Sequence, residues 1–430
     1  MNLWILIIIE SFFLMVAYAL FEGDYFAPPV ITILVMLVGT IMVIPSLQLW
    51  NVTISINTMA VMLIGFLSCN IGGILAKLIS NYRGKRTTGL VKKALHWHRT
   101  VEGLVLFLTL LLTILYMYNA IRVGILNGGS GLGAIAYMKS AYTSDSQGAK
   151  MNPLIRQGFK FVMAIAYIST YYFANNVLIM KEKICKNLSY LIAFICGCVI
   201  TIFSGSRTDI LRLVSALILD YVVIIRVSSG YQLKGKSIKS KIGLFHILKK
   251  FLPLLLAAVI IGFMSRAVVK VSDTGGSEIA SIIGYASFYV GSPIQVLNTK
   301  LTYFSNMKEL VFGTSTKIPD FVYLGNLDYG GNVATIFGSC IQYNGILKMV
   351  LYLLITYFIG TALYYHLYDA TANQQICRKR IIIYSYCYFV FTMAYYSICT
   401  IVLFEFSSLI VLGLIFLMYK PLRKLVIRVR

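Results

Sequence analysis

Long apolar runs separated by short polar connections form the dominant pattern of this sequence. A helix that crosses a membrane needs about 20 mostly apolar residues, and eleven runs approach that length. They lie near residues 3–22, 28–46, 57–78, 100–120, 158–180, 188–204, 208–226, 251–266, 345–366, 381–401 and 406–420. The pattern predicts an all-α polytopic membrane protein with about 11 transmembrane helices, folded as a single helical domain over residues 1–430.

Composition and charge agree with this class. Hydrophobic residues make up 59% of the chain and charged residues only 12%, against about 25% charged residues in soluble domains. On a soluble surface the net charge of +23 would suggest a nucleic-acid partner. Here roughly two thirds of the lysines and arginines lie in short clusters between apolar runs, as they do in cytoplasmic loops. The clusters are residues 77–99, 181–186, 226–250, 378–380 and 420–430. We therefore expect no nucleic-acid partner, an outer N-terminus and a cytoplasmic C-terminus.

Two connections on the outer side are longer than the rest. Residues 121–157 include the stretches LNGGSGLG and SDSQGAK, whose glycine and serine content is typical of a mobile loop. Residues 266–344 form the largest extracytoplasmic loop, and its stretch 279–299 is apolar enough to resemble a further span. A span there would move the basic clusters that follow it to the outer side. We therefore expect an interfacial helix, broken near Gly291 and Pro293.

Histidine and cysteine offer little to an outward-facing site. All four histidines, residues 96, 98, 246 and 366, fall on the cytoplasmic side in this arrangement. The HWH stretch at 96–98 lacks a nearby carboxylate or thiolate partner, so an interfacial anchoring role is favoured over a metal site. None of the eight cysteines forms a CxxC pair. We expect no metal and no other cofactor.

The stretch FSGSRTDILR, residues 203–212, places charge between two apolar runs. Ser206 is positioned to cap the helix that follows, with Asp209 three residues later in its first turn. Asp209 and Arg212 stand at i, i+3 and can pair on one helix face, which offsets the cost of an arginine about a turn into the membrane. Arg212 is also a candidate partner for Glu10, which lies in the middle of the first run and must face the bundle interior or a cavity.

The structural roles of Ser206, Asp209 and Arg212 do not explain Arg207. A cation at a helix N-terminus opposes the helix dipole and is unfavourable by roughly several tenths of a kcal/mol unless an anion binds. The free backbone N–H groups, the close approach that Gly205 allows and the arginine fork together make a phosphate site. The stretch therefore predicts an anion-binding site centred on Arg207, with a purely structural role as the alternative.

Other residues of the outer segments extend this site. Arg156 and Arg266 add cations, although Arg266 falls at a helix C-terminus, where a cation is favoured anyway. Tyr289 and Tyr343 can stack on sugars and hydrogen-bond them, while a membrane-interface belt is the plainer use of tyrosine. A cationic cleft at the outer surface of a helical bundle suits a lipid-linked phosphate or pyrophosphate, whose head lies at the interface while its tail stays in lipid.

Six short pieces follow one another between about residues 20 and 370. They are EGDYFAP (22–28), SGSRTD (204–209), SR (265–266), FYVGSPIQVLN (288–298), FG (312–313) and GNVATIFGSCIQYNGILKMVLY (331–352). Their order and spacing resemble the Wzy-type oligosaccharide repeat-unit polymerases of bacterial O-antigen and capsule synthesis. The resemblance implies a multi-pass glycosyltransferase of the bacterial cytoplasmic (inner) membrane that acts on the outer side.

The resemblance also implies a reaction. Such enzymes move a growing glycan from one undecaprenyl-pyrophosphate carrier to the non-reducing end of a fresh lipid-linked repeat unit, without a nucleotide sugar and without an evident metal. The implied partners are undecaprenyl-pyrophosphate-linked oligosaccharide, membrane lipid and, as a candidate protein partner, a chain-length regulator. Family arginines on outer loops engage the pyrophosphates, and Arg207 and Arg266 match them.

The identity of the catalytic base stays open, because this sequence departs from the family pattern at one position. Similar proteins often have an acidic residue just before the glycine of QYNG (342–345), whereas a glutamine and an asparagine flank the tyrosine here. Pyrophosphate is a good leaving group, so fixed guanidinium and N–H groups mainly have to stabilise the charge that develops on it. A carboxylate can take the proton of the acceptor hydroxyl, and the candidates are Asp209, Asp328 and Glu405.

Two other functions compete with polymerisation. A lipid-linked oligosaccharide flippase or other transporter also needs cations for a pyrophosphate, but it should carry them in a central cavity and often shows internal repetition. The sequence shows no repeat and collects these charges on the outer side. An O-antigen ligase-like glycosyltransferase should have a histidine in an outer loop, which this sequence lacks.

Overall fold

The structure is a computed structural model, and it describes residues 2–82, 93–135, 137–138, 148–205, 208–228, 249–254, 282–313, 318–325, 330–368, 374–394, 406–424 and 426–427. Within these ranges, seven helical segments are long and apolar enough to cross a membrane, by length and composition. They are Asn2–Leu20, Pro28–Ser46, Ile56–Ser80, Arg99–Leu126, Pro153–Ile179, Ile184–Phe203 and Gly345–His366. The protein is therefore a multi-pass helical membrane protein, and seven of the predicted spans are confirmed as helices of spanning length.

Two further predicted spans are helices that are too polar or too short to qualify as membrane-crossing helices. Residues 208–226 form α8 (Thr208–Ser228), but its charged side chains make it too polar to qualify by composition. Residues 406–420 form α16 (Phe406–Lys424), whose apolar part, Phe406–Tyr419, is shorter than a span. Both segments are helical as predicted, and their crossing of the membrane stays a prediction.

The last two predicted spans lie partly outside the described residues. The run 381–401 begins within α13 (Gln374–Cys387), continues as α14 (Phe389–Thr392) and leaves the described residues after 394. The run 251–266 is described only as far as residue 254. The predicted total of about 11 spans is therefore confirmed only for the seven segments above.

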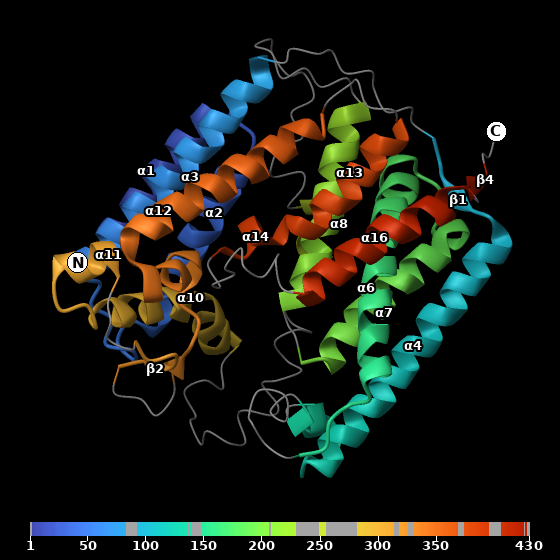
Figure 1. Cartoon of the computed structure of the whole chain (residues 1–430), viewed down its shortest axis with the longest axis horizontal. Coiled ribbons are helices and arrows are strands. Elements are labelled where there is room, and N and C mark those ends of the chain that lie inside the picture. Colours follow the sequence, from blue (N-terminus) through green and yellow to red (C-terminus); the bar gives the residue numbers. More distant parts are fainter. Residues whose placement is uncertain are drawn as a thin grey trace. The chain divides into compact units, whose positions relative to one another are not determined.

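The chain folds into two compact units. The first consists of Met1–Gly84, Thr274–His366 and Val390–Val402. Its helices are α1 (Asn2–Leu20), α2 (Pro28–Ile41), α3 (Ile56–Tyr82), α10 (Ile282–Leu301), α11 (Met307–Phe312) and α12 (Thr335–His366), with the short turn η1 (Ile44–Ser46). Strand β2 (Val322–Tyr323) pairs antiparallel with β3 (Gly330–Gly331). Helices α3 and α12 lie side by side (Figure 1).

Small residues allow α3 to approach α12 closely. A Cβ on Gly72 would lie 2.5 Å from the carbonyl oxygen of Leu354, and a Cβ on Gly65 would lie 2.5 Å from the ring of Phe337. Between membrane helices, such small residues let backbones and rings pack without a hydrophobic driving force from water. The α3–α12 contact therefore depends on glycine at these two positions.

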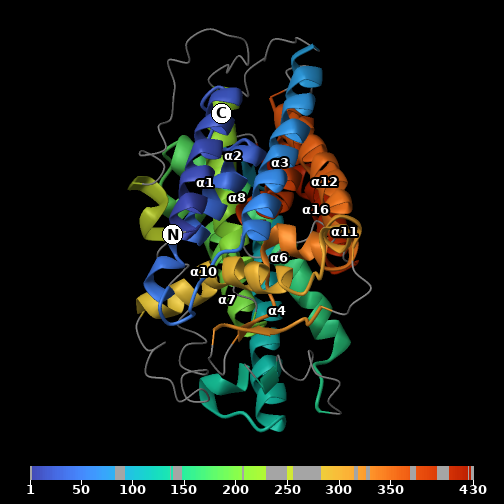
Figure 2. The ribbon, with the colours of Figure 1, turned by 90° about the vertical axis from the view of Figure 1, so that its left-hand side faces the viewer.

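Helix α10 runs crosswise to α1 and α3, whereas the spans of this unit run alongside one another (Figure 2). It packs on α2, α3 and α12. The predicted break near Gly291 and Pro293 is wrong, because α10 continues from Ile282 to Leu301 with the proline inside it. Tertiary contacts hold the helix on both sides of the proline. Ser287 bonds to the carbonyl of Met42, and Asn298 bonds to the backbone of residues 53 and 55. Packing therefore overrides the local preference of proline to end a helix.

The second unit consists of Lys85–Asp273, Leu367–Phe389 and Leu403–Arg430. Its elements are α4 (Arg99–Leu126), the turn η2 (Gly131–Gly133), α6 (Pro153–Phe173), the π-helical turn η3 (Ala174–Ile179), η4 (Ile184–Asn187), α7 (Leu188–Phe203), α8, α13 and α16. Helix α6 contacts α4, α7, α8, α13 and α16, and it is buried on nearly all sides from residue 162 to 172. It forms the core of this unit.

A short pair of strands joins two basic segments of the second unit. Strand β1 (His96–Trp97) pairs antiparallel with β4 (Val426–Ile427). The first follows the basic connection that begins at residue 77, and the second belongs to the basic tail. The pairing shows that the two segments lie together, and their position on the cytoplasmic side stays a prediction.

Candidate functional site

The ion pair predicted at the start of α8 is present. Arg212 Nη1 lies 2.8 Å from Asp209 Oδ1, and the two side chains are 16% and 15% exposed. The guanidinium carbon lies 3.9 Å from the centre of the Phe389 ring, a distance at which a cation is attracted to the ring face. The Nε of Arg212 is buried and has no hydrogen-bond partner among the described residues. The arginine is thus held on two sides and keeps one N–H group unused within that part of the chain.

Two tyrosines from other helices surround this pair. Tyr386 of α13 and Tyr167 of α6 pack edge to face with ring centres 5.0 Å apart, and both lie within electrostatic range of Arg212 and Asp209. The Tyr386 hydroxyl donates to the carbonyl of Ser408 at 3.2 Å. Sequence reasoning missed these rings and Phe389, because they come from segments remote from α8 in the chain.

The remaining predicted site residues are only partly described. Arg207, Arg266, Asp328 and Glu405 lie outside the described residues, as does the expected helix cap Ser206, and the side chain of Tyr343 is undescribed within α12. Arg156 is exposed in the first turn of α6, and Tyr289 is half-buried on α10 beside Phe288, with ring centres 5.0 Å apart. Among the predicted residues with described side chains, the structure brings Asp209 and Arg212 into contact.

Gly205 has a simpler role than the close approach to phosphate expected of it. It adopts a left-handed conformation with φ of 69° directly after the last turn of α7. Glycine is the usual residue for this way of ending a helix, because other residues are strained there. Helix termination therefore accounts for the glycine at position 205. The prediction of a phosphate site at residues 205–207 then rests on Arg207 and the helix N–H groups alone.

Three pieces of the motif series assemble within the first unit. Gly345, the glycine of QYNG, has φ of 69° and ψ of 177° and bends α12. A Cβ at this position would lie 2.4 Å from the backbone nitrogen of Gly313, in the FG piece. A Cβ on Gly338 would lie 3.2 Å from Leu297 Cδ1, in the FYVGSPIQVLN piece. Residues 288–352 therefore bring together pieces that the sequence could only place in order.

Buried polar groups accompany this assembly. Thr335 begins α12 with φ of 54°, is fully buried, and its hydroxyl has no hydrogen-bond partner among the described residues. Lys300 of α10 is 4% exposed. Burial lowers the pKa of Lys300, and the nearby Asp320 opposes that shift. A positive φ is uncommon for a β-branched residue and often marks a functional position.

Glu10 faces the interior of the first unit as predicted. It is fully buried in α1, and Thr40 Oγ1 of α2 lies within hydrogen-bond distance of its Oε1, at 2.9 Å. Arg212, its candidate partner, belongs to the second unit and pairs there with Asp209 one turn away on its own helix, so a pairing of Glu10 with Arg212 stays a prediction. A partner three residues away on the same helix is available as soon as that helix forms.

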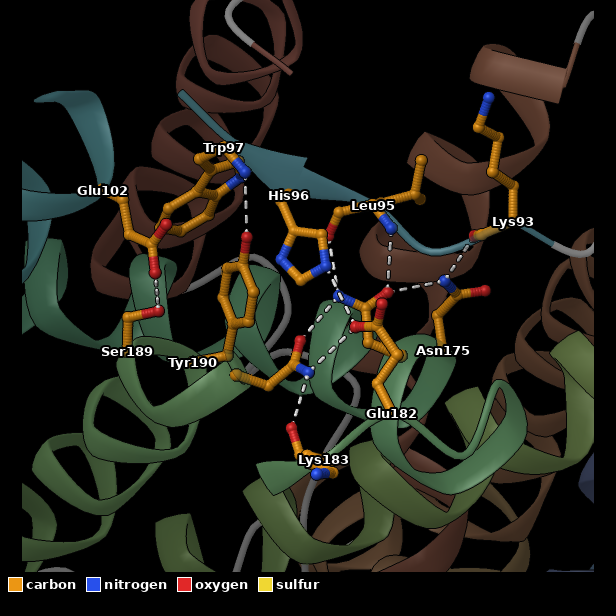
Figure 3. Close-up of polar contacts among 12 residues, drawn as sticks. Lys93, Leu95, His96, Trp97, Glu102, Asn175, Glu182, Lys183, Ser189 and Tyr190 are labelled. Carbon is orange, nitrogen blue, oxygen red and sulfur yellow. Dashed lines mark hydrogen bonds and ion pairs between the residues drawn. The ribbon is translucent and has the colours of Figure 1, made fainter. Parts of the chain in front are cut away.

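The second unit also contains a polar network around His96 that the sequence did not predict (Figure 3). His96 Nε2 lies 2.9 Å from Glu182 Oε2, which also accepts from Asn187 Nδ2 at 3.0 Å. The expectation that HWH lacks a carboxylate partner is therefore wrong. Next to it, the backbone N–H of Trp97 donates to the Tyr190 hydroxyl at 2.9 Å, and the Ser189 hydroxyl donates to Glu102. Within the described residues, no group of three or more His, Cys, Asp or Glu side chains could hold a metal ion.

Two adjacent asparagines of the π-helical turn tie the segment before His96 to this network. Asn176 accepts from the Leu95 N–H at 3.0 Å and donates to the Leu95 carbonyl at 2.7 Å, as a neighbouring strand would. It also donates to Asn187 at 2.8 Å and accepts from Asn175, which donates to the Lys93 carbonyl at 3.0 Å. The wide π-helical turn lets both asparagines face one segment, and such turns are frequent at functional sites.

We expect Asn176→Ala to destabilise the protein by about 3 kcal/mol, since it leaves both backbone groups of Leu95 and two neighbouring amides without their partner. Thermal unfolding and hydrogen exchange at residues 93–97 measure the effect. Asn119→Ala is the matched control, because Asn119 is half-buried and, among the described residues, bonds only the Leu115 carbonyl of its own helix. Equal stability and equal exchange in the two variants would show that the asparagine clamp does not hold this segment.

The chain matches no protein-family model, no curated protein and no solved structure in the comparisons with known proteins.

Proposed function

We propose that this protein polymerises undecaprenyl-pyrophosphate-linked oligosaccharide repeat units into O-antigen, capsular or exopolysaccharide chains on the outer face of the bacterial cytoplasmic membrane. The observation that carries the proposal is the guanidinium of Arg212, fixed between Asp209 and Phe389 near the start of α8 with its Nε unpaired among the described residues. A fixed guanidinium can stabilise the negative charge that develops on a departing pyrophosphate without having to reorganise.

The length of α8 supports an outer position for this arginine. The helix has 21 residues, about 30 Å at 1.5 Å per residue, which matches the hydrocarbon thickness of a bilayer. Its far end carries Arg226, which belongs to a basic cluster expected in the cytoplasm. If Arg226 lies at the inner surface, Asp209 and Arg212 lie close to the outer one. Six described segments of spanning length precede α8, so the N-terminus would then lie outside as well, and the C-terminus is expected in the cytoplasm.

The reaction can be divided among the chain's own residues. An acceptor hydroxyl attacks the anomeric carbon of the donor glycan, the bond from that carbon to the pyrophosphate oxygen breaks, and the hydroxyl proton passes to a carboxylate. Arg207 and Arg212 would bind the pyrophosphate. Asp209 already holds Arg212 through its Oδ1, so it is better suited to positioning than to accepting a proton. Asp328 and Glu405 are then the stronger candidates for the base.

The proposal is tested by incubating the purified protein with lipid-linked repeat units and separating the products by size. We expect a ladder of products from the wild type and none from Arg207→Ala at equal amounts of inserted protein. Movement of the substrate between leaflets without new glycosidic bonds would identify a flippase instead. Transfer of finished glycan to another acceptor, again without a ladder, would identify a ligase. A normal ladder from Arg207→Ala would remove Arg207 from the site.

A further inference from the structure

Asp220 is a buried carboxyl that the proposed reaction does not use. It lies on α8, about two turns beyond Arg212, and its side chain is fully buried. Helices α6, α8 and α13 contact one another (Figure 1), and residues of α6 and α13 face Asp220. An ionisable residue inside a membrane bundle is costly, and it usually binds something or pairs with a neighbour. None of the ion pairs among the described residues involves Asp220.

Two hydroxyl groups face this carboxyl, and each also lies within hydrogen-bond distance of a backbone carbonyl of its own helix. Ser385 of α13 lies within hydrogen-bond distance of Asp220 Oδ1, and its Oγ is also 2.8 Å from the carbonyl of Ile381. Thr170 of α6 faces the carboxyl as well, and its Oγ1 is 2.6 Å from the carbonyl of Tyr167. Donation to the carbonyl of the preceding turn is the ordinary arrangement for serine and threonine in membrane helices.

Counting protons decides how these atoms can bond. A hydroxyl has one proton, and a carbonyl oxygen and an ionised carboxylate are both acceptors only. Ser385 cannot donate fully to Asp220 and to Ile381 at once, so one of its two contacts needs a proton from elsewhere. Asp220 Oδ2 has no partner among the described residues. Among the described residues, an ionised Asp220 would therefore be a buried charge whose donors, the Ser385 and Thr170 hydroxyls, are both shared with backbone carbonyls, which is strongly unfavourable.

We propose that Asp220 is a proton-binding site inside the bundle: its carboxyl carries a proton and donates it to Ser385 Oγ, which donates in turn to the carbonyl of Ile381. The proton comes from water and no covalent bond to carbon changes. The relay links α8 to α13, so releasing the proton would place an unpaired negative charge at this contact. This inference does not depend on the proposed polymerase activity.

The same arrangement occurs independently in the first unit. Thr40 Oγ1 lies 2.9 Å from Glu10 Oε1 and 3.2 Å from the carbonyl of Met36, one turn back on its own helix. Glu10 Oε2 has no partner among the described residues. The count of protons is the same, so Glu10 is the second carboxyl expected to be neutral, and it provides an internal control for Asp220.

Infrared spectroscopy of the purified full chain in lipid nanodiscs tests the inference at neutral pH. A protonated carboxylic acid has a carbonyl band separate from the amide bands. We expect Asp220→Asn to lose one such band, and Glu10→Gln to lose a different one while the Asp220 band remains. The amide that Asp220→Asn introduces can donate to Ser385 in place of the acid, so we also expect this variant to keep its melting temperature and Asp220→Ala to lower it.

A second variant keeps the test decisive if Asp220→Asn fails to fold. Ser385→Ala removes the acceptor of the relay, so the Asp220 band should persist and shift to higher frequency. The inference is overturned if the acid bands of Asp220→Asn and Ser385→Ala are the same as those of the wild type, because Asp220 is then ionised. In that case, a melting temperature that falls when choline replaces sodium in the buffer, in the wild type but not in Asp220→Asn, would identify a cation site. No step uses a lipid-linked substrate, so failure of the polymerase proposal leaves this result intact.

Discussion

Replacing Gly345 with alanine should remove most of the folded protein. The residue has φ of 69° and ψ of 177°, a region of backbone conformation that is essentially confined to glycine and costs other residues about 1–3 kcal/mol. A Cβ there would also lie 2.4 Å from a backbone nitrogen and 2.5 Å from the carbonyl oxygen of Val311. Backbone atoms cannot turn aside as a side chain can, so we expect a total loss of about 4 kcal/mol.

The measurement is the yield of monodisperse protein after detergent extraction, together with its melting temperature. Gly413→Ala is the matched control, because a Cβ at Gly413 in α16 would meet no atom within 4 Å. Alanine is favoured over glycine inside a helix by about 1 kcal/mol, so this variant should be as stable as the wild type or slightly more stable. Equal yields of the two variants would show that α12 does not need its bend.

Arg212→Ala is expected to reduce product formation in the ladder assay by about 100-fold or more, the effect of removing one preorganised donor to a developing negative charge. It also leaves Asp209 unpaired in a largely buried position, at a cost to stability of about 3 kcal/mol. Arg212→Lys keeps the charge but loses the planar fork that lies over Phe389 and reaches Asp209, so its activity should be intermediate. Rates are compared per amount of folded protein.

Two controls separate chemistry from folding in this experiment. Arg122→Ala removes an exposed arginine of α4 and should leave both product formation and stability close to the wild type. A double-mutant cycle with Asp209→Ala measures the coupling of the pair, and the stability lost in the double variant should be smaller than the sum of the two single losses. Wild-type ladders from folded Arg212→Ala would exclude this arginine from the reaction.

Local patterns in the sequence predicted local structure well. The apolar runs predicted seven segments of spanning length, because the length and polarity of a run are properties of neighbouring residues. The pairing of Asp209 with Arg212 followed from their i, i+3 spacing on one helix. The position of Glu10 inside the bundle followed from the cost of exposing a carboxylate to lipid.

Contacts between distant segments could not be predicted in this way. The ring over Arg212 comes from residue 389, and His96 meets Glu182 across 86 positions of the chain. Asn175 and Asn176 gave a signal that was overlooked, since two adjacent amides in the last turn of an apolar run need buried partners. The continuity of α10 through Pro293 was missed because contacts with α2 and with residues 53–55 decide it.

The division of the chain has a consequence for biosynthesis. Helix α3 ends at Tyr82 and its main neighbour α12 begins at Thr335, a separation that takes the ribosome roughly 10–50 s to translate. During that interval, the face of α3 that carries Gly65 and Gly72 has not yet packed against α12. The first unit is completed only after the core of the second has been inserted, so mistakes in assembly should arise mainly at the face of α3 that receives α12.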